Sequence, residues 1–221
     1  MSHIKGGYRD RRGAIESRAA FVVRNLRWWL ERPRVAEEAK RWPVYERFLE
    51  SCSFPYEEAR HWFVGEVGAG PYGGMRRRLK TKAKCYIDYI QEELCELGFI
   101  EWPQEDWYVT APAEAIPLSN HQLDALVSFN CLDHGWGIER ALAECVRVAR
   151  RCYLSFDCRG DSPEQVAQRR GQDQDHWQLL RYDDVGEIVA RVAGERPWSM
   201  CDLKTNTHFP VVGLVICSDP M

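Results

Sequence analysis

The stretch "VGEVGAGPYGGMRRRLKTKAKCYIDYI", residues 64–90, decides the fold. It begins within the short apolar run "HWFVGEV" (61–67), continues through glycines and a basic segment, and ends in a second apolar run, "AKCYID" (83–88). Short apolar runs bounded by glycines or by an acid are typical of buried strands. The stretch therefore predicts a strand, a loop, a helix and a second strand.

The glycines of this stretch have the spacing of a nucleotide-binding loop. Gly68, Gly70 and Gly73 give the pattern G-x-G-x-x-G, and Asp88 stands 18 residues beyond Gly70. In such loops the glycines let the backbone approach the ligand, and a carboxylate at the end of the next strand accepts both hydroxyls of a ribose. Any adenosine cofactor fits this pattern, so the loop alone leaves a nicotinamide dinucleotide open.

The chain beyond the loop alternates between strand patterns and helix patterns. The predicted strands are "DWYVTA" (106–111), "LDALVSF" (123–129) and "CYLSF" (152–156). The predicted helices are "YIQEELCELG" (89–98), "IERALAECVRVAR" (138–150) and "YDDVGEIVARVAG" (182–194). This alternation predicts a parallel sheet covered by helices. The last apolar runs, 198–205 and 209–218, are too close in sequence for a crossover helix, so we expect the sheet to end antiparallel.

Two helices are expected before the glycine loop. Apolar residues recur at helical spacing from about Gly13 to Glu31, and "PVYERFLESC" (43–52) places Phe48 and Leu49 on one face, with Pro43 in its first turn. We interpret residues 1–60 as a helical N-terminal cap. Residues 61–221 are then the cofactor-binding domain.

Composition excludes several classes of protein. The chain has 221 residues, 45% of them hydrophobic and 29% charged, with a net charge of -3, which is typical of a soluble globular protein. We see no signal peptide and no apolar run long enough to span a bilayer, and we expect a cytoplasmic location. Nine cysteines without a C-x-x-C pair argue against both a disulfide framework and a structural zinc site, so no metal is expected.

Basic residues between 76 and 84, and others between 9 and 12, raise the question of nucleic acid binding. A solvated helix face explains the first group more simply, because the net charge of the chain is slightly negative. We therefore disfavour nucleic acid as a partner.

Together these motifs resemble class I S-adenosylmethionine-dependent methyltransferases. "EVGAGP" (66–71) is similar to the first motif of the family, "AEAIPL" (113–118) to the end of its third strand, and "LDALVSFNCLDH" (123–134) with "ALAECVRV" (141–148) to its fourth strand and the following helix. The resemblance covers about residues 62–217. It implies an α/β fold of Rossmann-like methyltransferase type: a mostly parallel seven-stranded sheet with an antiparallel C-terminal strand and helices on both faces.

The resemblance also implies which residues bind S-adenosylmethionine. Glu66, Gly68 and Gly70 would border the methionine part of the cofactor. Asp88 would hold the ribose, and Tyr89 would pack on the adenine, although a plain packing role for Tyr89 is equally open.

The ends of the third and fourth strands contribute further residues by resemblance. Ala113 and Glu114 would lie near the adenine edge, and Asn130 with Cys131 would face the methionine moiety. Members of the family often have an aspartate where this chain has Pro112, so one adenine hydrogen bond is replaced or absent.

Candidates for the chemistry follow the fourth strand. His134 is the first candidate for a general base, because histidine titrates near neutrality, and Asp133 is its neighbour. Tyr72, His176 and Trp177 are candidates for the acceptor pocket. For all of these residues a structural role, such as capping a turn or packing, stays open.

The sequence therefore predicts an S-adenosylmethionine-dependent methyltransferase that modifies a hydroxyl of a small molecule or a sugar. One alternative is a non-catalytic cofactor-binding subunit of a larger complex, and a protein partner is left open. A less favoured alternative is an NAD-dependent oxidoreductase, which leaves the motifs after the glycine loop unexplained.

Overall fold

The structure is a computed structural model of the whole chain. It describes residues 8–9, 15–16, 22–23, 25–27, 30–31, 34–71, 79–98, 105–135, 137–158, 180–203 and 211–217. The first group of strands is β1 (Tyr8–Arg9), β2 (Ile15–Glu16), β3 (Phe63–Val67), β4 (Ala83–Asp88) and β5 (Trp107–Thr110). The second group is β6 (Leu123–Ser128), β7 (Ala149–Asp157), β8 (Trp198–Leu203) and β9 (Val211–Cys217). The helices are α2 (Arg34–Ser51), α3 (Tyr56–Ala59), α4 (Gln91–Glu96), the 3₁₀ turn η1 (Leu132–His134), α5 (Ile138–Val148) and α7 (Tyr182–Ala193).

Seven of these strands form one sheet, in the order β5-β4-β3-β6-β7-β9-β8. Six strands run in one direction, and β9 is antiparallel to both of its neighbours, β7 and β8. The predicted α/β fold class is confirmed, including its antiparallel C-terminal strand. The chain crosses the sheet outward from β3 through β4 to β5 and then returns to β6 on the other side of β3. The switch point between β3 and β6 is where open α/β sheets bind ligands.

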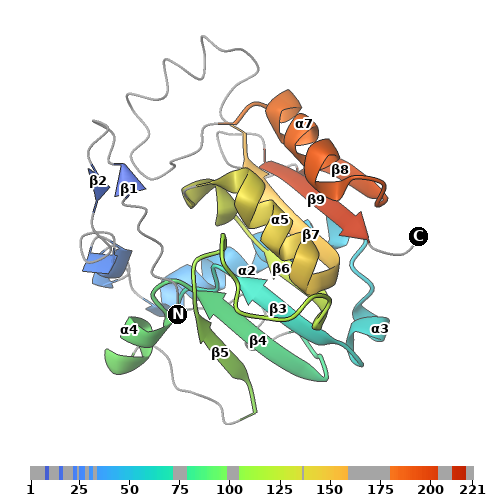
Figure 1. Ribbon diagram of the computed structural model, residues 1–221. Coiled ribbons are helices and arrows are strands. Elements are labelled where there is room, and N and C mark those ends of the chain that lie inside the picture. Colours follow the sequence, from blue (N-terminus) through green and yellow to red (C-terminus); the bar gives the residue numbers. More distant parts are fainter. Residues whose placement is uncertain are drawn as a thin grey trace.

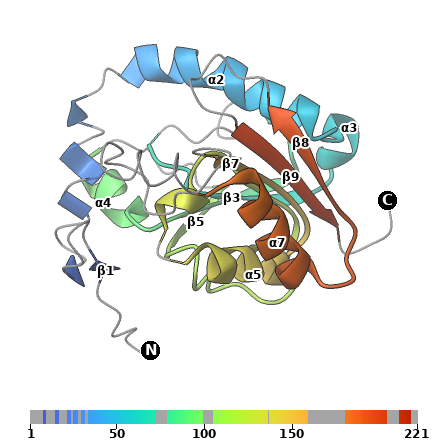
Figure 2. The same cartoon turned by 90° about the horizontal axis from the view of Figure 1, so that it is seen from above.

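Helices cover both faces of the sheet. Figure 2 shows α5 and α7 on one face and α2 on the other, with the sheet between them. In Figure 1, α5 and α7 lie in front of the strands and α2 lies behind them. Helix α5 buries Ile138, Leu142, Cys145 and Val146 against the sheet, and these residues recur at helical spacing along one stripe.

Glycines end two of the helices. Gly98 follows α4 with φ +71° and donates its N–H to the carbonyl of Cys95 at 2.9 Å. Gly194 ends α7 with φ +60° and donates to the carbonyl of Ala190 at 3.3 Å. Both positions need the left-handed conformation that glycine adopts without a steric penalty.

The N-terminal region differs from the prediction in two ways. Helix α2 begins at Arg34, so Pro43 lies inside it and not in its first turn. The residues before Pro43, "RVAEEAKR", are mostly strong helix formers, and the Pro43 side chain is exposed, so the helix accommodates the missing N–H at its solvent face.

The predicted helix from about Gly13 to Glu31 starts too early, because Ile15–Glu16 pairs antiparallel with Tyr8–Arg9. Backbone pairing outweighs the helical periodicity there. Residues 22–23, 25–27 and 30 are helical as predicted.

Helix α2 is part of the main core. Its residues Tyr45, Phe48 and Leu49 are buried in one cluster with Val64 of β3 and Tyr86 of β4. The proposed boundary between a cap and a cofactor-binding domain near residue 60 stays a prediction, but α2 packs as one layer of the fold.

The helix predicted after the glycine loop falls largely on residues 72–78, which lie outside the described residues. Residues 79–82 form no helix, and Lys84 belongs to β4, so this part of the basic run is not a helix face.

All nine cysteines are free thiols. In the part of the chain that the structure describes, His, Cys, Asp and Glu side chains form no group of three that would hold a metal ion. Nor does any helix there combine the length and the apolar character needed to cross a bilayer.

Candidate functional site

The candidate site lies at the carboxyl ends of β3, β4, β5 and β6, where most of the predicted residues meet. Asp88 ends β4, and its carboxylate accepts two backbone hydrogen bonds: Gly70 N–H donates to Oδ2 at 2.8 Å, and Ile90 N–H donates to Oδ1 at 3.1 Å. The carboxylate therefore fixes the glycine loop against the end of the neighbouring strand. Two hydrogen bonds also hold it in one orientation.

The glycines of the loop are required by its geometry. Gly68 has φ +72° and Gly70 has φ +53°, a region that L side chains rarely adopt. A Cβ on Gly68 would also overlap the side chain of Cys131, which follows β6. The structure thus brings the first glycine of the loop and a residue of the fourth-strand motif into direct contact across the switch point.

Cys131 is surrounded by acidic groups. Burial raises the pKa of its thiol well above the usual range, and the negative charges of Asp88, Asp133 and Glu114 raise it further, in that order. The thiol is therefore protonated near neutral pH and is no nucleophile. The charges of three carboxylates from three different loops thus act on Cys131, and such a field favours a cationic ligand over an anionic one.

Glu114 supports the turn that leads into α5. Its side chain is 7% exposed, and Oε1 accepts the N–H of Gly137, the residue before α5, at 3.1 Å. A Cβ on Gly135 would lie 2.7 Å from the same oxygen, so a larger residue there would displace the Glu114 carboxylate. The neighbouring Ala113 is half-buried and packs against the core under α5. Both predicted residues thus lie close to the end of β6.

Asn130 is held by the end of β7. It has φ +48°, and its N–H donates to Ser155 Oγ at 2.8 Å. In the orientation that satisfies both groups, its side-chain nitrogen donates to Asp157 Oδ1 at 3.0 Å. The N–H of Asp157 in turn donates to Asp133 Oδ2 at 3.3 Å. This network joins the ends of β6 and β7.

Ser155 and Asp157 are residues that the sequence analysis missed. The signal was present, because Asp157 directly follows the predicted fifth strand, while Asp88 ends the second. Polar side chains at the carboxyl ends of parallel strands gather at one edge of the sheet. Applied to every strand, this rule finds Asp157.

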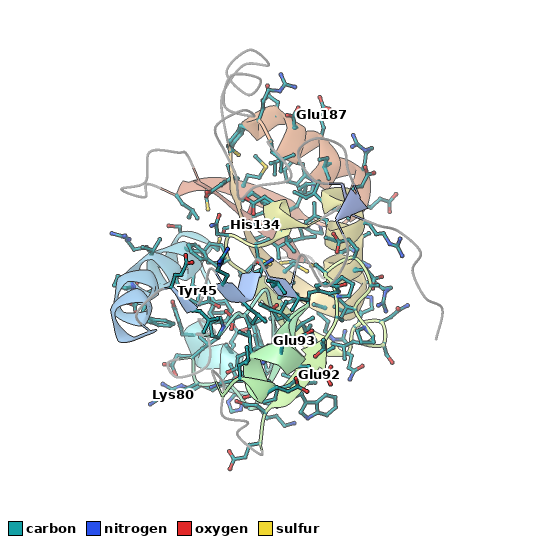
Figure 3. All side chains as sticks on the ribbon, turned by 90° about the vertical axis from the view of Figure 1, so that its left-hand side faces the viewer. Tyr45, Lys80, Glu92, Glu93, His134 and Glu187 are labelled. Carbon is teal, nitrogen blue, oxygen red and sulfur yellow. The ribbon has the colours of Figure 1, made fainter. Side chains whose placement is uncertain are left out.

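The two predicted catalytic residues lie on η1. Asp133 is fully buried, while His134 is half-buried and donates its N–H to the carbonyl of Cys131 at 3.0 Å. Figure 3 shows Tyr45 on α2, and it shows His134 beside the ribbon of α5. The η1 turn thus places His134 at the carboxyl edge of the sheet. Asp133, on the same turn, contacts β7 through the N–H of Asp157.

The other predicted site residues are Tyr89 and the three candidates for the acceptor pocket. Tyr89 is half-buried in the turn after β4 and packs on the cluster formed by Val22, Ile90 and Leu94. The predicted acceptor-pocket residues Tyr72, His176 and Trp177 lie outside the described residues.

A second group that the sequence analysis missed lies on α2. The ring of Tyr45 stacks on Trp42 with centroids 5.5 Å apart and meets Phe129 edge-on at 5.7 Å. Phe48 completes this aromatic cluster at 5.4 Å from Phe129. Phe129 directly precedes Asn130, so helix α2 contacts the site across the end of β6.

Comparison with known proteins gives a consistent family. Residues 66–152 match the family model of a methyltransferase domain, which includes the glycine loop, Asp88 and the fourth-strand motif. No curated protein matches the sequence.

Solved structures share the fold at very low sequence identity. A candidate methyltransferase from Bacillus halodurans C-125 superposes with a TM-score of 0.62 at 11% identity, over 80% of this chain and 99% of the other. Phosphoethanolamine N-methyltransferase 2 from Haemonchus contortus, in complex with phosphomonomethylethanolamine and S-adenosylhomocysteine, gives 0.62 at 9% identity, over 80% and 53%. A chain of the complex between the Haloferax volcanii methyltransferase activator Trm112 and a candidate methyltransferase gives 0.58 at 9%, over 80% and 93%. At such identities these structures support the fold alone.

Proposed function

The chain belongs to the class I S-adenosylmethionine-dependent methyltransferase family, and from this premise we propose that it methylates a hydroxyl group of a small molecule or a sugar. A cytoplasmic location belongs to the same proposal. The single observation that carries cofactor binding is the arrangement of Asp88, held by the N–H groups of Gly70 and Ile90, beside a glycine loop packed against Cys131.

The geometry of this edge fits the cofactor. We propose that the carboxylate oxygens of Asp88 accept hydrogen bonds from the ribose hydroxyls. Gly68 and Gly70 permit close backbone approach, and Glu66, buried at 3% exposure just before them, supplies negative charge near the methionine part. S-adenosylmethionine supplies an electrophilic methyl group on a sulfonium.

The other loops would border the same ligand. Tyr89 and Ala113 are proposed to lie along the adenine, with Glu114 shaping that edge through its bond to Gly137. Asn130 and Cys131 are proposed to border the methionine part. The acidic surroundings of Cys131 support this assignment, since a sulfonium and an ammonium are both cationic.

His134 is proposed to accept the proton of the acceptor hydroxyl on an imidazole nitrogen. Asp133 would position the η1 turn, because its buried carboxylate accepts the N–H of Asp157 from the neighbouring strand. The loops and α2 would exclude water and align the acceptor, which are the main requirements of a one-step displacement.

The acidic surroundings also weigh against the dinucleotide alternative. NAD has an anionic pyrophosphate that would lie against the glycine loop, on the side where Asp133 and Glu114 act on Cys131. These carboxylates repel a pyrophosphate and attract a sulfonium. A protein partner stays part of the proposal, supported by the Haloferax volcanii neighbour, which is a member of a complex with an activator.

Calorimetric titration with S-adenosylmethionine, S-adenosylhomocysteine and NAD tests the cofactor. We expect the sulfur nucleotides to bind and Asp88→Asn to weaken them by about 10- to 100-fold, because a charged hydrogen-bond acceptor is lost. Asp124→Asn is the matched control: Asp124 Oδ2 accepts the N–H of Phe63 at 2.8 Å at the opposite edge of the sheet. Binding of NAD alone would overturn the methyltransferase assignment.

The role of His134 needs a separate experiment. A screen of alcohols, phenols and sugars with labelled S-adenosylmethionine identifies the acceptor, after which His134→Gln is compared with the wild type. We expect slower transfer at unchanged cofactor affinity. Full turnover in the variant excludes His134 as an essential base, and tight cofactor binding with no methylation of any acceptor favours the non-catalytic subunit.

A further inference from the structure

Tyr45 carries a polar group whose function the preceding assignments leave open. The residue lies on the buried side of α2 at 3% exposure, and within the described part of the chain its hydroxyl has no hydrogen-bond partner. Burying a hydroxyl without a partner costs free energy, so such groups are rare and commonly have a functional reason. Replacement by phenylalanine would remove that cost, yet the sequence has tyrosine.

Glu66, the acid that precedes the glycine loop, lies on the face of the sheet that α2 covers. Glu66 pairs in register with Tyr86 on one side and Val127 on the other, and both of these belong to the core under α2. Register neighbours in parallel strands share a face of the sheet, so Glu66 also faces α2. Burial raises the pKa of the Tyr45 hydroxyl well above its usual value, and the negative charge of Glu66 raises it further.

Tyr45 also lies at the switch point of the sheet. Its ring contacts Phe129 at the end of β6, while Glu66 lies on β3, so the side chain spans the two strands between which ligands enter such folds. Trp42 and Phe48 fix the ring from either side along α2. The hydroxyl is thus held in place before any ligand binds.

The charges of the site indicate which ligand atoms need this hydroxyl. The amino-acid end of S-adenosylmethionine has an ammonium and a carboxylate. Glu66, Asp88, Asp133 and Glu114 suit the ammonium and the sulfonium but repel the carboxylate. A neutral donor that stays protonated satisfies a carboxylate without adding charge to a buried site, and a buried tyrosine hydroxyl is such a donor.

We propose that Tyr45 binds the amino-acid end of the cofactor, with its hydroxyl donating a hydrogen bond to the ligand carboxylate while Glu66 faces the ammonium. This inference rests on the proposed function, because it assigns a part of the same cofactor site. It adds helix α2 to that site and explains the tyrosine, because the ligand supplies a partner that the hydroxyl does not find among the described residues.

Two ligands distinguish a contact of Tyr45 with the amino-acid end from a general effect on cofactor binding. S-adenosylhomocysteine has the amino-acid end, whereas 5′-methylthioadenosine has the same nucleoside and thioether without it. Titrating both into the wild type and Tyr45→Phe, we expect about a 5- to 10-fold loss of affinity for S-adenosylhomocysteine and no change for 5′-methylthioadenosine. Tyr153→Phe is the matched control, because Tyr153 is buried in the same core but lies on β7 and packs on Phe54. It should change neither affinity.

Thermal unfolding of the free protein supplies a second measurement. Tyr45→Phe should leave the melting temperature unchanged or raise it, because it removes a buried hydroxyl without a partner. A lower melting temperature with unchanged ligand affinity would show that the hydroxyl has a structural partner and would overturn the inference. Equal loss of both ligands would also overturn it. If the wild type binds neither ligand, the proposed function itself fails, which distinguishes the two failures.

Discussion

The two faces of the sheet are both buried, but by different side chains. Under α5 and α7 the described core is almost entirely aliphatic, with Phe156 as its single fully buried aromatic residue. Under α2 the described core contains five buried aromatic residues, namely Tyr45, Phe48, Phe54, Tyr86 and Tyr153. The same sheet thus separates an aliphatic face from an aromatic face.

We infer from this difference that the aliphatic face serves stability, whereas the aromatic face also serves ligand binding. Aliphatic side chains have no polar group to satisfy, so the face under α5 and α7 is complete in the free protein. Tyrosine hydroxyls and the carboxylate of Glu66 are polar groups in a dry interior, and they need partners. We therefore expect substitutions on the aliphatic face to change folding alone, and substitutions that disturb Tyr45 on the aromatic face to change the affinity for S-adenosylhomocysteine as well.

The largest expected effect compares Phe48→Ala on the aromatic face with Leu142→Ala on the aliphatic face. Both side chains are buried at 1% exposure or less, so each truncation should cost about 3–5 kcal/mol of unfolding free energy. Chemical denaturation measures this. Calorimetry below the unfolding transition should show weaker S-adenosylhomocysteine binding only for Phe48→Ala, which frees Tyr45 and Phe129. Equal affinities in the two variants would break the comparison.

The glycine loop lies at the carboxyl edge of the sheet, between its aliphatic face and its aromatic face. We expect Gly68→Ala to destabilise the protein by about 3 kcal/mol, because it adds strain at φ +72° to an overlap with Cys131. Gly98→Ala is the matched control: φ is +71° there, but a Cβ meets nothing within 4 Å, so strain alone should cost about 1–2 kcal/mol. Differential scanning calorimetry compares the two. Equal losses would mean that the contact with Cys131 has no energetic weight.

These contacts also show which parts of the molecule the sequence predicts. Helices α4, α5 and α7 depend on neighbours in sequence, and each lies within the range predicted for it. Gly68, Gly70 and Asp88 were predicted as one group from their spacing, and the hydrogen bond from Gly70 to Asp88 joins them. Their role toward the cofactor stays a prediction.

Residues that meet across distant elements could not be predicted in this way. Tyr45 meets Phe129, and Asn130 meets Ser155 and Asp157, only because β6 lies between β3 and β7. Strand order is a tertiary property, and no local pattern encodes it. Pro43 misled the prediction for the opposite reason, because a strong local signal was overridden by the helix-forming residues before it.

A smaller effect is expected at Gly213, in the middle of β9. A Cβ there would lie 2.7 Å from Cys201 Sγ and 3.0 Å from Cys52 Sγ, so Gly213 leaves room for two thiols under the aromatic face. Gly213→Ala should cost about 2 kcal/mol through overpacking. Adding Cys201→Ala should recover more than half of that loss in urea denaturation. No recovery would show that β9 resists the substitution for another reason.

The smallest expected effect is electrostatic and belongs to the aliphatic face. Glu144 of α5 accepts hydrogen bonds from Arg147 and from the N–H of Ile116, and the bond from Arg147 is the main cause that lowers the pKa of its carboxyl. A lowered folded-state pKa stabilises the protein above the unfolded-state value of about 4.3, and this contribution is lost as the pH falls through the folded-state value.

Glu144→Gln should therefore reduce the unfolding free energy by about 1 kcal/mol at pH 7, since the pair is partly exposed and screened. The difference from the wild type should shrink to zero between about pH 4 and pH 2, where the wild-type carboxyl is protonated. Urea denaturation across this range checks the sign. Glu139→Gln is the control, because the Glu139–Arg191 pair is more than half exposed and should contribute almost nothing at any pH. A difference that persists at low pH would assign the stabilisation to packing of the side chain and not to its charge.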